Sequence, residues 1–280
     1  MKKITSDWHN HTHCSCDSAC MDFEDLILDA GNYGIQNFGV SDHLHAINLE
    51  KDIAASRKEY EKAMQNHPEL RGHFHFGVEA SVMSQWEADK IRKGELTGDV
   101  TYGLRSGGPA NDKPIICIDN EFMEKYHIDY VVSGVHWTLY CEDTPSAVVK
   151  DYFRQYLYAA AFPHTDILAH FCWWNPTPNM TNPFADFSVI TPSMRSELKS
   201  ALLENDTAFE VNIGAILLNP AYSPAFVDEY LGYVSELQKA GVVLSVGTDS
   251  HSPHLAPADY ELAEKLFACH GIDPDKFFTM

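Results

Sequence analysis

The stretch Asp7-Trp8-His9-Asn10-His11 decides the fold class, because it ends the first apolar run of the chain with two histidines spaced one residue apart. On an extended strand, side chains two positions apart point the same way, so both imidazoles can reach one metal ion. The stretch Gly247-Thr-Asp249-Ser-His251 repeats this spacing after the last apolar run. Parallel α/β folds form their active sites where such runs end.

Short apolar runs alternate with helical patterns along the chain. The runs, which predict strands, cover residues 4–8, 38–40, 74–78, 130–135, 167–169, 208–213 and 242–246. Predicted helices cover residues 23–30, 49–66 and 258–268, and others begin at Thr144-Pro145, Thr191-Pro192 and Ser223-Pro224. We expect Asp22 to cap the first helix and Gly34 to end it. Seven strand–helix repeats predict an α/β fold with a parallel sheet, and they fit an open doubly wound sheet as well as a closed barrel.

One segment, residues 93–113, breaks this rhythm. It is rich in Gly, Asp and Thr and contains Arg105-Ser-Gly-Gly-Pro109. The composition predicts a long loop or a small hairpin, and loops of this length tend to serve function. No domain boundary is evident, so we expect residues 1–280 to form a single domain with a loop insertion at about 93–113.

Composition restricts the partners. The chain has 280 residues, 45% of them hydrophobic, which suits one α/β barrel. It carries 40 acidic and 20 basic residues, and the resulting net charge of -20 repels phosphate backbones. We therefore expect no nucleic-acid partner. The charge says nothing about the oligomeric state.

No apolar stretch approaches the roughly 18 to 20 residues of a membrane span. No apolar run follows the first residues, Met-Lys-Lys, as a signal peptide would require. The seven cysteines are irregularly spaced, which favours reduced thiols. These features predict a cytoplasmic protein without membrane contact.

Six of the seven apolar runs end in side chains that bind metals. These residues are His9, His11, Asp42, His43, Glu79, His136, His170, Asp249 and His251. Imidazole nitrogens and carboxylate oxygens suit Zn, Mn or Fe, so the pattern predicts a cluster of two or three divalent ions. Glu79 could bridge two ions through its two oxygens. A bridged pair lowers the pKa of a shared water and clamps the oxygens of a substrate.

Other residues near these runs allow alternative interpretations. Cys14, Cys16 and Cys20 could form a structural zinc site, but no second Cys/His pair stands at finger-like distance. Trp173 and Trp174 serve either as core packing or as an aromatic wall for a substrate ring. Glu210 and Asn212 could support the metal ligands or contact the substrate. Surface or packing roles are expected for His73, His75, His127, His164 and His270.

These motifs together resemble the PHP (polymerase and histidinol phosphatase) family, in its histidinol-phosphatase-like branch. The matching stretches are residues 7–18, Ser41-Asp42-His43, Gly77-Val-Glu79-Ala, Ser133-Gly-Val-His136, Glu210-Val-Asn212 and Gly247-Thr-Asp249-Ser-His251. They occur in family order from about residue 5 to 270. One departure is Ala169-His170-Phe171-Cys172, where relatives often have Gly-His-x-Asp, so that the second carboxylate is missing.

The resemblance implies a distorted (β/α)7 barrel with a trinuclear metal site at the C-terminal ends of the strands. By position, the first ion would take His9, His11, Glu79 and Asp249, the second Glu79, His136 and His170, and the third Asp17, His43 and His251. Asp17 enters only through the resemblance, because it follows no strand.

The resemblance further implies a phosphatase, with histidinol phosphate as the favoured substrate in histidine biosynthesis. A metal-bound hydroxide would attack phosphorus in line. Arg105 and Arg154 are candidates to hold a phosphate oxygen, and His254 or His45 could protonate the leaving alkoxide. The alternatives are hydrolysis of another small phosphate ester, a phosphodiester or an amide, and a non-catalytic, metal-stabilised binding module.

Overall fold

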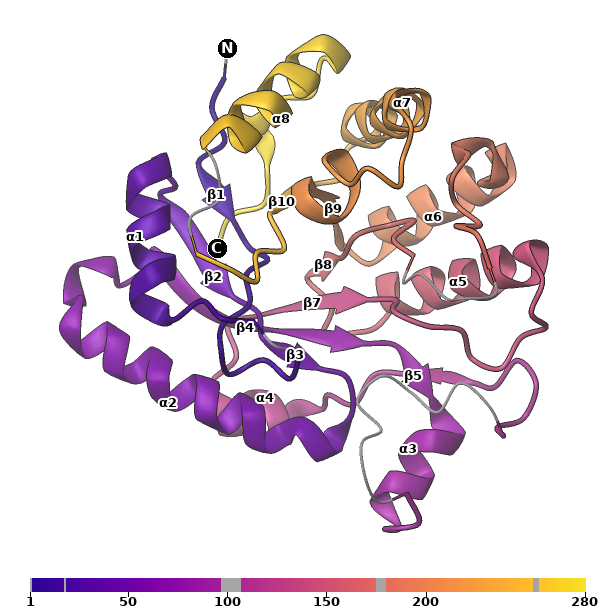
Figure 1. Ribbon diagram of the computed structural model, residues 1–280, viewed down its shortest axis with the longest axis horizontal. Coiled ribbons are helices and arrows are strands. Elements are labelled where there is room, and N and C mark those ends of the chain that lie inside the picture. Colours follow the sequence, from indigo (N-terminus) through magenta and orange to yellow (C-terminus); the bar gives the residue numbers. More distant parts are fainter. Residues whose placement is uncertain (1, 18, 97–106, 175–179, 254–256) are drawn as a thin grey trace.

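A nearly closed barrel of parallel strands forms the centre of the protein (Figure 1). The computed structural model describes residues 2–17, 19–96, 107–174, 180–253 and 257–280. Within these residues the barrel strands follow one another in chain order: β1 (Ser6–Asp7), β2 (Asn37–Val40), β4 (Phe74–Ser81), β7 (Tyr130–Gly134), β8 (Ile167–Leu168), β9 (Ala208–Asn212) and β10 (Leu244–Gly247). The short β3 (His43–Leu44) also pairs with β4 in parallel. The expected distorted barrel of seven parallel strands is confirmed.

The barrel closes where its first and last strands meet. The Trp8 amide donates to the Val246 carbonyl at 3.2 Å, and a parallel bridge joins Asn10 to Ser250. Below this seam the buried Asp7 carboxylate accepts hydrogen bonds from Thr248 Oγ1 at 2.6 Å and Tyr260 Oη at 2.8 Å. The chain thus brings its two histidine-bearing ends to one place.

Helices surround the strands (Figure 1). They are α1 (Phe23–Tyr33), α2 (Glu50–Asn66), α3 (Gln85–Arg92), α4 (Asn120–Tyr126), α5 (Pro145–Ala160), α6 (Pro192–Glu204), α7 (Pro224–Ala240) and α8 (Pro257–His270). Local sequence explains their ends. Asp22 forms a capping box with Asp25, and Gly34 ends α1 in the left-handed conformation with φ of 75°. Thr144 and Ser223 cap helices that have proline in the first turn, as expected.

The inside of the barrel is filled by large side chains below the site. Trp8, Tyr130, Val132 and Ile167 belong to this buried cluster. The Tyr130 hydroxyl donates to the carbonyl oxygens of Trp8 at 2.8 Å and Val40 at 3.0 Å. The polar end of this buried side chain therefore has hydrogen-bond partners. The barrel interior is therefore a packed core, and the cavity described below lies at the C-terminal ends of the strands.

The predicted insertion begins and ends in regular structure. After β4 come β5 (Met83–Ser84) and α3, and β5 pairs antiparallel with β6 (Pro114–Ile115). Residues 97–106, which include Arg105, lie outside the described residues. Apolar periodicity did not predict α3, α4 or the β5–β6 pair, because each is short and lacks a long apolar period. No helix among the described residues is long and apolar enough to cross a membrane.

Candidate metal centre

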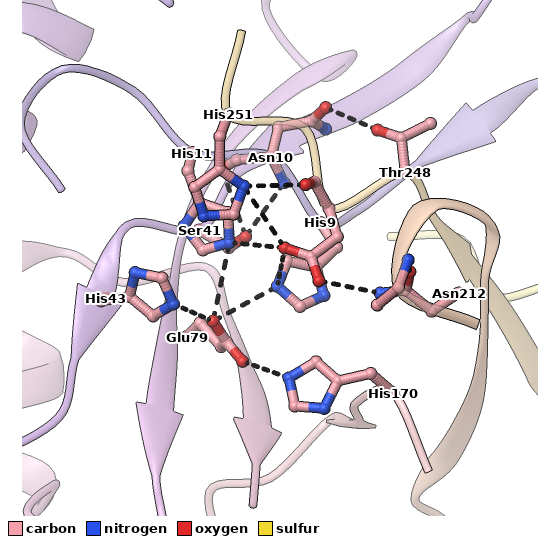
Figure 2. Close-up of polar contacts among 12 residues, drawn as sticks. His9, Asn10, His11, Ser41, His43, Glu79, His170, Asn212, Thr248 and His251 are labelled. Atoms are coloured by element: carbon pink, nitrogen blue, oxygen red, sulfur yellow. Dashed lines mark hydrogen bonds and ion pairs between the residues drawn. The ribbon is translucent and has the colours of Figure 1, made fainter. Parts of the chain in front are cut away.

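The ligand-type side chains converge on a cavity of about 370 Å³ at the C-terminal ends of the strands. Its lining includes Asp17, His43, His45, Glu79, His136, His170, Trp173, Asp249 and His251. Figure 2 shows part of this cluster, with the imidazoles of His9, His43 and His170 turned toward Glu79. Six of these residues, His43, Glu79, His136, His170, Asp249 and His251, follow the predicted strands and lie at one rim of the barrel.

Glu79 is the centre of the cluster. Its Oε2 atom lies 2.8 Å from His43 Nε2 and 3.3 Å from His9 Nε2. Its Oε1 atom lies 2.8 Å from His170 Nε2 and 3.1 Å from His136 Nε2. Each carboxylate oxygen therefore faces its own set of imidazoles, and Oε2 also lies 3.6 Å from His11 Nε2. This is the arrangement that a carboxylate bridging two cations requires.

Asp249 joins the cluster from the last strand. Its Oδ1 atom lies 3.2 Å from His11 Nε2 and 3.6 Å from His9 Nε2. Its backbone amide donates to the His9 carbonyl at 2.8 Å, and its φ of 57° turns the side chain toward the two rings. The barrel seam thus places a carboxylate beside both histidines of the first strand.

Asp17 lies at the outer edge, in the segment that follows β1. Its Oδ2 atom lies 2.5 Å from His251 Nε2 and 3.5 Å from His43 Nδ1. The His43 ring also stacks on His11, with 4.2 Å between the ring centroids. Strand periodicity could not place Asp17, because its position depends on the path of a loop. The structure brings it to the two histidines with which the resemblance grouped it.

Four groups of donor atoms in the described residues are close enough to hold an ion. They are His9, His11 and Glu79; His43, Glu79 and His136; His11, His43 and His251; and Cys16, His43 and His45. The first three overlap with the sets that the resemblance implies, although His43 here also faces Glu79. Burial raises the pKa of the Cys16 thiol to about 12, and a neutral thiol is a poor ligand.

Several buried polar atoms in the cluster make no hydrogen bond of good geometry among the described residues, although some of them lie in ion-pair contacts. They are His9 Nε2, both ring nitrogens of His11, Asp17 Oδ1, Glu79 Oε2 and His170 Nδ1. Burying one unsatisfied polar atom costs about 1–3 kcal/mol, so a group of them aimed at common points calls for a ligand. Divalent cations would satisfy nitrogen and carboxylate oxygen together, and the donor set therefore fits metal ions.

The charge states of the cluster agree with this interpretation. Burial lowers the pKa of His11 to about 3 and that of His136 to about 4, so both rings are neutral. Burial alone would raise the pKa of Glu79 and Asp249, but the surrounding histidines hold both well below their usual values. Ionised carboxylates and neutral imidazoles are the forms that bind cations.

Two histidines instead hold protons against the carboxylates. Burial opposes this, yet Glu210 and Asp249 raise the pKa of His9 well above its ordinary value. In the same way, Glu79 and Asp17 overcome burial and raise the pKa of His43 to about 10. These protons supply positive charge at the points where the carboxylates converge, and bound cations would replace them.

A second layer of side chains orients the ligands. Glu210 Oε1 lies 2.7 Å from His9 Nδ1, and Glu210 Oε2 accepts the His170 backbone amide at 2.7 Å. Asn212 donates to Glu210 at 3.0 Å and to Asp249 at 3.3 Å, while its Oδ1 atom caps the short π-helix η4 (Ile213–Leu217). Glu210 and Asn212 thus hold the candidate ligands in place, which is one of the two roles left open above.

The barrel wall is tight around the cluster. A Cβ atom added at Gly134 would lie 2.5 Å from Glu79 Oε1, and one added at Gly247 would lie 2.2 Å from Glu210 Oε1. Both glycines stand on strands beside the carboxylates they accommodate. Any larger residue would push a carboxylate away from its histidines.

The remaining candidates lie in different surroundings. Trp173 lines the cavity, with its ring 5.4 Å from His170 and 5.5 Å from His136, whereas Trp174 is buried against Tyr152. Only Trp173 can therefore serve as the aromatic wall. His45 also lines the cavity. His254 lies outside the described residues, as Arg105 does.

Arg154 takes part in a structural ion pair. Its Nε atom donates to Asp151 at 2.8 Å, and its Nη1 atom donates to the Asp112 carbonyl at 2.6 Å. These bonds tie α5 to the base of the insertion and turn the guanidinium away from the cavity lining. The described residues that line the cavity include neither lysine nor arginine.

The sequence reasoning missed Ser81, whose hydroxyl lies between two imidazoles. Ser81 Oγ is 2.6 Å from His45 Nδ1 and 2.7 Å from His136 Nδ1. A signal was available, because Ser81 follows Glu79 by two positions on β4 and so faces the same side.

Comparison with known proteins supports the architecture. No protein-family model and no curated protein sequence matches the chain. Among solved structures, the histidinol phosphate phosphatase of Lactococcus lactis, determined with zinc, L-histidinol and phosphate, is 16% identical with a TM-score of 0.63. The match covers 96% of this chain and 95% of that one. A Listeria monocytogenes protein provisionally assigned as a histidinol phosphatase is 15% identical, with a TM-score of 0.54 over 88% of this chain and 95% of its own. At this identity the likeness establishes the fold.

Proposed function

We propose that the protein is a metal-dependent phosphoesterase of the PHP type that hydrolyses a small phosphomonoester, with histidinol phosphate as the favoured substrate. The observation that carries the proposal is the buried Glu79 carboxylate, which faces an imidazole pair with each oxygen. The Lactococcus lactis protein of similar fold was determined with zinc, L-histidinol and phosphate, which supports the choice of substrate.

The centre would hold two or three divalent ions of zinc, manganese or iron. His9, His11, Glu79 and Asp249 would hold the first, Glu79, His136 and His170 the second, and Asp17, His43 and His251 the third. Bound ions would supply Lewis acidity and lower the pKa of a coordinated water toward neutrality. The unpartnered ring nitrogens and carboxylate oxygens support this assignment.

The chain's own residues would bind and orient the substrate. Glu210 holds the His9 ring and the His170 backbone, so both imidazoles are fixed before a substrate arrives. Trp173 forms one wall of the cavity and would pack against the organic part of the ester. The deep position of the cluster would keep bulk water from the reacting phosphate.

A second candidate is hydrolysis of another small phosphate ester. It is favoured by the described cavity lining, which lacks lysine and arginine, and by Cys172, which stands near where relatives often carry a carboxylate. A different pocket wall with the same ligands would change the substrate and leave the reaction unchanged.

The test is phosphate release by the purified protein loaded with zinc or manganese. Histidinol phosphate should be compared with generic phosphomonoesters and a phosphodiester, each with and without chelator. We expect chelator-sensitive turnover on histidinol phosphate with kcat/KM of about 10⁴ M⁻¹s⁻¹ or more. Equal, weak turnover on every monoester would favour the second candidate. Metal-loaded protein without activity on any ester would refute the proposal.

A further inference from the structure

Ser81 connects a proposed metal ligand to a histidine that the proposed function does not use. Its buried hydroxyl is within hydrogen-bond distance of His136 Nδ1 on one side and His45 Nδ1 on the other. The His45 ring is buried, packs edge-on against Trp137 at 5.3 Å, and lines the cavity. A continuous chain of polar atoms therefore runs from Glu79, through His136 and Ser81, to His45.

The chemistry of a hydroxyl restricts this chain. Serine has one hydrogen, so Ser81 can donate to only one of the two rings, and the other ring must donate to its oxygen. An ion bound at His136 Nε2 needs the lone pair of that nitrogen, which leaves the ring hydrogen on Nδ1. His136 then donates to Ser81, and Ser81 must donate to His45 Nδ1. The hydrogen of the neutral His45 ring consequently stands on Nε2.

We propose that Ser81 is a positioning residue that couples the metal centre to His45, so that His45 offers an Nε2–H donor to a phosphate oxygen only when an ion is held by His136. The inference rests on the proposed metal centre. Without an ion, His136 Nε2 keeps its hydrogen for the Glu79 carboxylate, which lies 3.1 Å away. The order of donors then reverses, and His45 Nε2 becomes an acceptor.

The contents of the cavity give this change a consequence for binding. Among the described lining residues there is no lysine or arginine, and the other histidines there belong to the proposed ligand sets. A phosphate oxygen needs hydrogen-bond donors and is repelled by a nitrogen lone pair. His45 would therefore favour an oxyanion in the loaded protein and disfavour it in the metal-free protein.

The first measurement is the tautomer of His45, read from long-range ¹H–¹⁵N spectra of protein labelled at histidine. Spectra would be recorded after chelator treatment and after zinc loading, and His45→Gln would assign the signal. We expect hydrogen on Nδ1 without zinc and on Nε2 with zinc. In Ser81→Ala, loaded with enough zinc to reach the zinc content of the wild type, His45 should lose this preference.

The second measurement is the affinity of the zinc-loaded protein for inorganic phosphate, by calorimetry. Ser81→Ala and His45→Phe should each raise the Kd about three- to tenfold, the effect of one neutral hydrogen bond. His45→Gln, whose amide can donate from the Nε2 position, should recover part of the loss. Ser133→Ala is the matched control, because Ser133 is a buried serine that bonds only to Thr165 Oγ1, at 2.8 Å, among the side chains described. It should keep the wild-type Kd.

The outcomes separate the two proposals. The coupling alone is overturned if His45 keeps its hydrogen on Nδ1 in the zinc-loaded wild type. It is also overturned if zinc-loaded Ser81→Ala shows the Nε2 form of His45 to the same extent as the zinc-loaded wild type. Wild-type phosphate affinity in both Ser81→Ala and His45→Phe overturns the role of His45 as a donor. A protein that binds no zinc at all refutes the metal centre, and the coupling with it.

Discussion

Replacing Glu210 by glutamine tests whether the second layer of side chains controls metal binding. Glutamine has nearly the shape of glutamate but offers one acceptor oxygen and one NH₂ donor in place of two acceptors. In the wild type, one oxygen faces His9 Nδ1, and the other accepts the His170 amide and the Asn212 side chain. In Glu210→Gln the new NH₂ group must therefore face either His9 Nδ1 or the two donors from His170 and Asn212.

The two orientations of the new amide differ in cost. With its oxygen toward His170 and Asn212, the NH₂ group faces His9 Nδ1, and the other orientation opposes two donors. Asn212 cannot simply turn over, because its Oδ1 atom accepts the Ala215 amide at 2.7 Å. The first orientation is therefore favoured. It makes His9 Nδ1 an acceptor and moves the ring hydrogen to Nε2, the atom that faces Glu79 and Asp249.

Loss of that lone pair should weaken the site that His9 shares with His11. Changes behind a metal ligand typically cost about 10- to 100-fold in metal affinity, which is about 1.4–2.8 kcal/mol. We expect this loss for zinc in competition with a chromophoric chelator, together with fewer ions retained per chain in elemental analysis. Glu264→Gln is the control, since Glu264 is also buried and accepts the Ile4 amide at 3.0 Å far from the cavity. Wild-type zinc affinity and content in Glu210→Gln would refute the reasoning.

Four further outcomes follow from the structure. Gly134→Ala should reduce zinc affinity at least tenfold in the same competition assay, because its Cβ would lie 2.5 Å from Glu79 Oε1; unchanged affinity would contradict the close contact. Tyr130→Phe should lower the free energy of unfolding by about 1–3 kcal/mol in urea, since two buried carbonyl oxygens lose their donor; a smaller change would mean that water replaces it. Chelator should lower the melting temperature and added zinc should restore it, as ligand binding to the folded state requires; an unaffected melting curve would argue against bound metal. Zinc uptake should release protons near neutral pH, because Glu79 and Asp17, against the effect of burial, hold the pKa of His43 at about 10 in the metal-free protein. Zinc affinity should therefore rise with pH. Calorimetric heats of zinc binding that do not depend on the ionisation heat of the buffer would contradict this proton release.

Strand periodicity and helix capping were enough to predict a parallel α/β fold with most of the cluster at one rim, whereas the barrel was expected only from the resemblance. His9, Glu79 and Asp249 stand at strand ends, where neighbouring parallel strands bring their side chains to one rim. Such positions depend on backbone geometry, which repeats along the chain and can be inferred from the sequence pattern. Periodicity left open whether the sheet closes, and the seam between β1 and β10 resolves that question.

Residues outside the strands were harder to predict. Asp17 reaches His251 through a loop whose path has no period, so only the resemblance suggested it. Arg154 was a candidate for phosphate binding, yet its guanidinium is held by Asp151. Asp151 lies three residues earlier on the same helix, and this spacing alone would have suggested the ion pair. Trp173 and Trp174 are adjacent and alike in sequence, but one faces the cavity and the other the core, because the chain turns at His170 with a positive φ.

The closure of the barrel also sets an order of events in biosynthesis. His9 and His11 belong to the first strand, whereas Asp249, which lies against both, follows the last one. A ribosome releases the first strand long before β10 exists, so a nascent chain cannot assemble this pocket however favourable its local sequence. Any ion held between these side chains would therefore have to bind after β10 has formed. If the proposed centre is correct, His9 and His11 would lack their carboxylate partner from Asp249 until the last strand closes the barrel.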